Sequence, residues 1–242
     1  MSRLLIKMKG CNQAAVTLRE NYSIQRLIYN LLQASKFQKI RNRKENMPFC
    51  FSNVFKTQDD VDCIIIASPH ESLNYFLWDQ FEKIHQIRIG EKSFVIHEVR
   101  MFNLKIQNPV TDVVTSTPVV ALVRKTKCQR SALNTSNRHG YFFWTPTYPM
   151  DILKQQMYAN IQKKYRAFFS EEPSMFTIHL EKLRGMIASK IETPRTQATV
   201  IGTYWQMKFQ CLDEEEMRTM RFTFDVGLGE RNTLGFGFIN PI

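Results

Sequence analysis

The chain of 242 residues lacks any long apolar stretch. No segment approaches the ~18 consecutive apolar residues that a membrane-spanning helix needs. The first residues mix Lys and Arg into their apolar run, whereas a signal peptide holds a clean apolar block. We therefore expect a cytoplasmic protein. Core-forming side chains are not scarce, because 43% of the residues are apolar, and this excludes a disordered chain.

Cysteine and metal-binding patterns are also missing. The five cysteines are odd in number, lie at long spacings and form no C-x-x-C, which excludes a disulfide framework and a cysteine zinc site. Neither H-x-x-x-H nor HExxH occurs. The acidic run Asp213–Glu216 is contiguous, so its side chains cannot converge on one face. We expect no metal and no cofactor.

Acidic residues are few relative to basic ones. The chain has 33 Lys and Arg against 22 Asp and Glu, which gives a net charge of +11 and a pI near 9.5. This excess favours a polyanionic partner, above all nucleic acid, over a merely solvated basic surface. Five cations fall within the nine residues from Lys36 to Lys44, and a second basic run extends from Arg124 to Arg138.

Apolar periodicity predicts the order β-α-β-β-α-β in each half of the chain. We expect a helix over Ser23–Ala34 with Ser23 as its N-cap, and a long helix from Pro149 to Phe169. The other predicted elements are strands over Ser2–Lys9, Phe49–Phe55, Val61–Ser68, Gln86–Ile89, Phe94–Phe102, Pro118–Arg124, Met175–Ile187 and Ala198–Cys211, and helices after Pro69 and over Asp213–Met220.

This order of elements defines the ferredoxin-like unit. The segment Asn103–Ser116 carries few large apolar residues and contains Pro109, so we place the domain boundary there. The sequence therefore predicts an α+β fold of two tandem ferredoxin-like (βαββαβ) domains, residues 1–108 and 115–242.

The most distinctive motif is the glycine-rich C-terminus. It is not a dinucleotide fingerprint, because Asn232 stands where the third glycine belongs. It is not a P-loop, because Gly229 and Gly235 are one residue too far apart and no Lys follows. Its Gly-Phe-Gly-Phe-Ile resembles the core of an RNA-recognition octapeptide, but Leu234 replaces the basic residue of that motif.

Glycines allow positive φ and a close approach of backbone, and successive N–H groups in such a loop can bind phosphate. We favour this interpretation over a tight turn before an edge strand, since Arg231 lies in the loop. The glycines concerned are Gly227, Gly229, Gly235 and Gly237.

The pattern Gly-x-Gly-x-x-x-x-x-Gly-Phe-Gly resembles that of the CRISPR-associated repeat-RNA endoribonucleases, which belong to a superfamily of tandem ferredoxin-like proteins. Gln25–Asn30, Phe94–Val99 and Pro118–Lys125 resemble the family's first helix, the last strand of its first domain and the opening strand of its second. The resemblance implies metal-independent cleavage of CRISPR precursor RNA within each repeat, with 2′,3′-cyclic phosphate and 5′-hydroxyl ends. It leaves open a homodimer and a place in a CRISPR effector complex.

The resemblance also implies site residues. Tyr29 matches the family's helix Tyr by its context Leu-Ile-Tyr-Asn, but the segment Lys36–Pro48 holds no His where the family has one. Lys with a depressed pKa can act as acid or base, and Arg can stabilise phosphorane charge. We predict as catalytic Tyr29, Lys39, Arg43 and Lys44, and as RNA-binding Lys36, Arg41, Lys125, Lys127 and Arg130 together with the four glycines and Arg231.

Two alternatives stay open. The cations after the first helix can serve only to hold backbone phosphates, in which case the protein binds repeat RNA without cutting it. The fold superfamily also contains structural subunits of CRISPR effector complexes.

Overall fold

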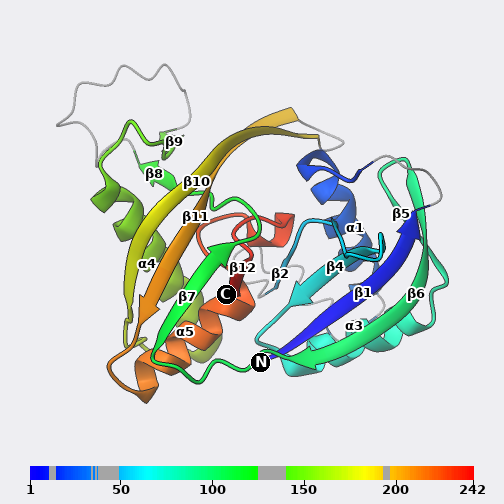
Figure 1. The fold of residues 1–242 in the computed structure, drawn as a ribbon, viewed down its shortest axis with the longest axis horizontal. Helices are drawn as coiled ribbons and strands as arrows, with labels where there is room; N and C mark the ends of the chain where they lie inside the picture. Colours follow the sequence, from blue (N-terminus) through cyan, green and yellow to red (C-terminus); the bar gives the residue numbers. More distant parts are fainter. Residues whose placement is uncertain (11–14, 34, 36, 38–48, 125–139, 193–196) are drawn as a thin grey trace.

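The computed structural model describes residues 1–10, 15–33, 35, 37, 49–124, 140–192 and 197–242. Figure 1 shows two units side by side, each a β-sheet with its own helices, and the red C-terminal segment lies between them. Among the described residues, no helix is both long enough and apolar enough to cross a membrane.

The first unit has one antiparallel sheet in the order β2-β4-β1-β6-β5, and β3 also pairs with β4. Its strands are β1 (Ser2–Gly10), β2 (Cys50–Phe51), β3 (Phe55–Lys56), β4 (Asp62–Ala67), β5 (Gln86–Ile89) and β6 (Lys92–Asn103). The first strand, β1, therefore lies between β4 and the last strand, β6. This is the arrangement that two interleaved βαβ units give in a ferredoxin-like fold.

The core of this unit forms between β1 and two helices, α1 (Asn21–Leu32) and α3 (Glu71–Glu82). Alternate residues of β1 point to one face, so Leu4, Ile6 and Met8 are all buried against the helices. On α1 the buried residues recur at 3–4 spacing, as Ile24 and Ile28 show.

The start of α1 differs from the prediction. Ser23 is not its N-cap, because the chain turns earlier, in the 3₁₀ helix η1 (Leu18–Glu20). There the Thr17 side chain accepts from the backbone N–H of Arg19, and the Glu20 carboxylate accepts from the N–H of Thr17. This capping box starts the helical turn at Leu18, six residues before Ile24, where the apolar periodicity begins.

The second unit repeats the strand order of the first. Its elements are β7 (Val110–Thr115), α4 (Met150–Phe169), β10 (Thr177–Glu192), β11 (Gln197–Gln210), α5 (Glu214–Val226) and β12 (Ile239–Pro241). The sheet runs β10-β11-β7-β12, so its first strand again lies between its third and fourth strands. The two tandem ferredoxin-like units predicted from the sequence are thus confirmed.

The prediction that Pro118–Arg124 is the opening strand of the second unit was wrong. The opening strand is β7, which begins inside the segment that the prediction left between the two domains. Pro118–Arg124 instead contributes β8 (Leu122–Arg124), which pairs with β9 (Tyr141–Phe143) in a separate two-stranded sheet. Five of the six residues of β7 are Val or Thr, so β-branching was the signal, and the search for large apolar residues missed it.

Helix α5 extends beyond the prediction. The Asp213 carboxylate accepts from the N–H of Glu216 and caps the helix as its acidic start indicated, but the helix continues to Val226. Phe222 and Phe224 in the added turn are buried against α4 and the second core. Packing therefore extends a helix that the local sequence appeared to end at Met220, and Gly227 follows it directly.

Candidate nucleic-acid interface

The glycine-rich loop runs from α5 to β12 and is closed by its own hydrogen bonds. The N–H of Leu228 donates to the carbonyl of Gly237 at 2.8 Å, and the N–H of Glu230 donates to the carbonyl of Val120 at 2.8 Å. Asn232 Nδ2 lies inside the loop and donates to the carbonyls of Leu228 and Phe236, both at 2.9 Å. A short 3₁₀ turn, η3 (Asn232–Leu234), forms its outer end.

All four glycines of the loop are buried and have positive φ. A Cβ on Gly237 would lie 1.8 Å from the Leu228 carbonyl oxygen, and one on Gly229 would lie 2.4 Å from that of Val120. A Cβ on Gly235 would lie 2.4 Å from the Phe51 ring. These glycines are therefore required by packing. Several loop N–H groups already bond protein carbonyls, so phosphate binding through a backbone nest remains a prediction.

The loop is attached to helix α1 of the first unit. Asn21 Nδ2 donates to the carbonyl of Leu234 at 2.9 Å, and Gln25 Nε2 donates to Thr233 Oγ1 at 3.0 Å. Tyr29 follows Gln25 by four residues, so it lies one turn further along the same side of α1. The structure thus brings together the two features that carried the resemblance, although they are some 200 residues apart in the sequence.

Tyr29 is half-buried and packs edge-on against Phe49, with ring centroids 5.9 Å apart and an interplanar angle of 84°. Phe49 follows directly after the basic segment, and Phe37, which is also buried, lies at its start. The basic residues predicted for this segment lie outside the described residues, as do those predicted after β8: Lys36, Lys39, Arg41, Arg43, Lys44, Lys125, Lys127 and Arg130.

Arg231 lies at the start of η3 with a φ of 63°. Its guanidinium lies over the Phe143 ring of β9, 6.0 Å from the centroid. Burial lowers the pKa of Arg231, and its Nε is a buried donor without a hydrogen-bond partner in the described part of the chain. The Arg231 side chain is half-buried, so its guanidinium is partly open to an anion such as phosphate.

Sequence reasoning missed Lys164 of α4. Its side chain is half-buried, and its Nζ donates to the carbonyls of Gly227 at 2.7 Å and Gly229 at 2.9 Å. Burial lowers the pKa of Lys164 to about 7. The neighbouring Lys163 is exposed. No sequence signal distinguishes the two lysines, because only the position of the glycine loop decides which of them is covered.

Sequence reasoning also missed the polar contact that joins the units, made by Arg3 of β1. Its Nη2 donates to the carbonyls of Phe224 at 2.9 Å and Ile239 at 3.1 Å, and its Nη1 donates to Asn240 Oδ1 at 2.6 Å. The buried carboxyl of Asp225 lies in the same cluster, and burial raises its pKa to about 7. The first strand of one unit is thereby fixed to the last strand of the other.

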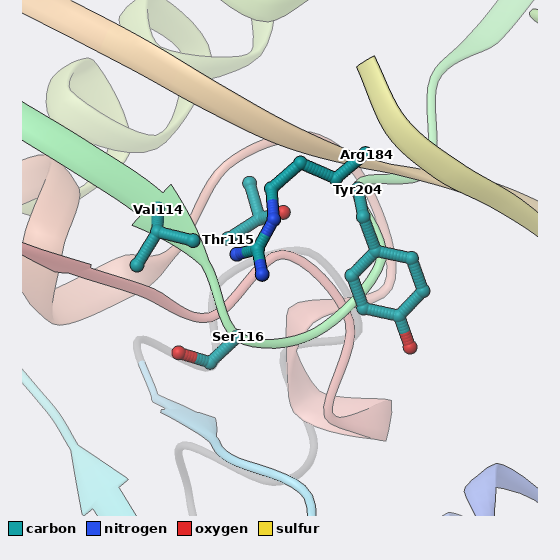
Figure 2. Close-up of a pocket in the computed structure, with 5 residues that line it drawn as sticks. All are labelled: Val114, Thr115, Ser116, Arg184 and Tyr204. Carbon is teal, nitrogen blue, oxygen red and sulfur yellow. The ribbon is translucent and has the colours of Figure 1, made fainter. Parts of the chain in front are cut away.

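A pocket of about 370 Å³ lies on the second unit, lined by Val114, Thr115, Ser116, Arg184 and Tyr204. Figure 2 shows Arg184 extending across it between Thr115 and Tyr204. The register of β10 shifts between Leu183 and Gly185, so Arg184 is the unpaired residue of a bulge, which re-aims its side chain. Tyr204 is hydrogen-bonded to Asn53 of the first unit, and burial raises its pKa. An Arg beside an aromatic ring suits a nucleotide.

Within the described residues, no group of three or more His, Cys, Asp or Glu side chains is placed to hold a metal ion. The candidate site is therefore made of tyrosine, arginine, lysine and backbone groups. Its described parts are Tyr29 on α1, the glycine loop, and the Arg184 pocket.

Comparison with known proteins supports the fold. Two solved structures match almost the whole chain. One is described as an RAMP protein binding different RNA substrates, with a TM-score of 0.80, 17% identity and full coverage of both chains. The other is a protein from a Cas6-related gene of Pyrococcus furiosus, with a TM-score of 0.79, 16% identity and coverage of 99% and 98%. At identities of 16–17% the structural likeness shows the fold alone. By its fold, the chain belongs to the class of proteins with two tandem ferredoxin-like units.

The sequence comparisons go further. Residues 103–241 match the family described as CRISPR associated protein Cas6, C-terminal, which is more than half of the chain. The CRISPR-associated endoribonuclease Cas6 2 of Methanocaldococcus jannaschii is 28% identical over 91% of both chains. The CRISPR-associated endoribonuclease Cas6 of Haloferax mediterranei is 23% identical over 99% of this chain and 93% of its own. The chain belongs to the Cas6 family.

Proposed function

We propose that this Cas6 family member is an endoribonuclease that cuts CRISPR precursor RNA within each repeat, without a metal ion, and leaves 2′,3′-cyclic phosphate and 5′-hydroxyl ends. The family and the names of its relatives support the endoribonuclease class. One structural observation carries the site: α1, with Tyr29, is hydrogen-bonded to the C-terminal glycine loop.

In this reaction the 2′-oxygen of the RNA bonds to the adjacent phosphorus, and the bond from phosphorus to the 5′-oxygen breaks. The 2′-hydroxyl proton must go to a base, and the leaving 5′-oxygen must receive a proton. A phenol can take part in such transfers, so we assign Tyr29 an acid–base or orienting role. The negative charge that develops on the non-bridging oxygens of the phosphorane is stabilised by cations, for which we propose Lys39, Arg43 and Lys44.

We propose that the RNA extends from this site over two further surfaces. One is formed by Arg231 together with Lys125, Lys127 and Arg130, which hold backbone phosphates. The other is the Arg184 pocket, where the guanidinium binds a phosphate and the Tyr204 ring contacts a base. Lys36 and Arg41 hold phosphates next to the scissile bond.

Cleavage in the presence of EDTA tests the proposal. Wild-type protein at saturating concentration should cut its repeat RNA in EDTA, and Tyr29→Phe should lower the single-turnover rate constant by roughly tenfold to a thousandfold, because proton transfer contributes about 10²–10⁴ to such rates. Denaturing gels with end-group analysis measure both. Tyr75→Phe is the matched control, because Tyr75 is 53% exposed on α3, and it should cut at the wild-type rate.

Uncut RNA under these conditions would contradict the proposal. If binding then proved tight and salt-sensitive, a non-catalytic repeat-binding function would replace it. The missing His in Lys36–Pro48 is the observation that favours this second function. Copurification with effector-complex subunits, without preference for repeat RNA, would instead favour a structural subunit.

The Arg184 pocket makes a separate prediction about affinity. Arg184→Met should raise the dissociation constant for repeat RNA about five- to tenfold and lower the salt slope by about one, because one phosphate contact is lost. Filter binding at several salt concentrations measures both. Arg88→Met is the control, because Arg88 is also an exposed Arg on an edge strand, in the other sheet. Equal effects of the two variants would remove the pocket from the RNA path.

A further inference from the structure

Lys164 occupies a position that a cation rarely takes. It reaches from α4 to the base of the glycine loop, and its Nζ lies within hydrogen-bond distance of two backbone carbonyls, those of Gly227 and Gly229. These residues flank Leu228, whose own N–H and carbonyl are bonded within the loop. The carbonyls of Gly227, Leu228 and Gly229 therefore each accept a hydrogen bond from a side chain, and Lys164 supplies two of these three bonds.

The same limb is linked to the other end of the loop. Asn232 donates from Nδ2 to Leu228 and Phe236, so the two limbs are held at a fixed separation. The next two residues, Thr233 and Leu234, accept the hydrogen bonds from Gln25 and Asn21 of α1. Hydrogen bonds therefore run without interruption from α4 through the loop to the helix that carries Tyr29.

The Lys164 amine points inward to the two loop carbonyls that accept its hydrogen bonds, so we expect it to hold the loop rather than to contact RNA. Its hydrogen bonds do not depend on a full charge either. An uncharged amine still has two N–H bonds, one for each carbonyl. The carboxylate of Glu230 in the loop is the nearby charge that opposes burial and raises the pKa of Lys164. The contacts suit an amine that holds a backbone in place.

We infer that Lys164 is a positioning residue for RNA cleavage, acting through the glycine loop on α1 and Tyr29. This inference rests on the proposed function. The loop fixes the direction in which Thr233 and Leu234 meet α1, and a displacement of about 1 Å at a reacting group can lower a rate a hundredfold.

The test compares two adjacent lysines of α4. Lys164→Met should lower the single-turnover rate constant at saturating protein by about tenfold to a hundredfold, while the dissociation constant for repeat RNA stays within about twofold of wild type, because no RNA contact is lost. Lys163→Met removes the same charge from the exposed neighbour and should cut at the wild-type rate. Thermal unfolding of each variant shows whether it is folded at the assay temperature.

A second variant keeps the inference testable if Lys164→Met does not fold. Thr233 lies half-buried at the outer end of the loop. The substitution Thr233→Val keeps the shape of the side chain but removes the oxygen that accepts the hydrogen bond from Gln25. It should also lower the rate constant without weakening binding. Its effect should be less than additive with that of Lys164→Met where both fold, since both act on one loop.

The possible failures are distinguishable. If the wild type cuts and both variants cut at its rate, the positioning role is wrong and the proposed function stands. If either folded variant binds weakly but cuts normally at saturation, the loop acts in binding and the inference is overturned. If the wild type does not cut in EDTA, both the proposed function and this inference fall.

Discussion

Replacing Gly235 with alanine should destabilise the protein by about 2–4 kcal/mol and lower RNA cleavage by at least about a hundredfold. Gly235 has a φ of 74°, and an added Cβ would lie 2.4 Å from Phe51 Cε2 and 2.7 Å from Asn21 Nδ2. Phe51 and Asn21 belong to the first unit, so the methyl group would push the loop away from α1. Urea unfolding and single-turnover cleavage measure the two effects.

Gly140→Ala separates backbone strain from collision. Gly140 has a φ of 65° but nothing within 4 Å of its added Cβ, so its substitution should cost only about 1 kcal/mol and leave cleavage intact. Phe51→Leu combined with Gly235→Ala should restore part of the lost stability, because it removes ring atoms from the collision. Equal losses for Gly140→Ala and Gly235→Ala would show that the interface at Gly235 adds nothing beyond backbone strain.

Replacing Arg3 with methionine should lower the free energy of unfolding by about 3–5 kcal/mol, as expected when one partner of a buried polar cluster is removed. The substitution leaves the carbonyls of Phe224 and Ile239 without their buried donor. It also removes the cation nearest to the buried carboxyl of Asp225, whose pKa is already raised to about 7. Urea unfolding at pH 7 measures the change.

Arg100→Met provides the matched comparison. Arg100 lies on β6, next to β1, but is exposed, and its substitution should change stability by less than about 0.5 kcal/mol. If Arg3→Met proved as mild as Arg100→Met, the Arg3 cluster would contribute nothing measurable to holding the two units together.

The fold could largely be predicted from the sequence, because each unit has its own apolar core with a local pattern. Strand β1 alternates and helix α1 has buried residues at 3–4 spacing, so both could be read within a window of a dozen residues. Strand β7 could not be read in this way, since five of its six residues are Val or Thr, the sixth is Asp112, and β11 and β12 pair with it on either side.

The candidate site was only partly predictable. Tyr29 and the glycine loop could be singled out because their residue types and spacing are distinctive. Lys164, Arg3 and Arg184 could not, because each resembles an ordinary surface cation in its local sequence. What distinguishes them is a covering or facing segment from a distant part of the chain.

The sequence by itself determined the class of fold, the basic charge and the two motifs that led to the Cas6 family. Each of these depends on composition or on a pattern within a short segment, and both can be read without knowing how the chain folds. Only the tertiary structure decided that the glycine loop joins α1, and that Lys164 rather than Lys163 holds it. The physical reason is that a hydrogen bond between distant segments depends on where packing places them, and no local pattern encodes that position.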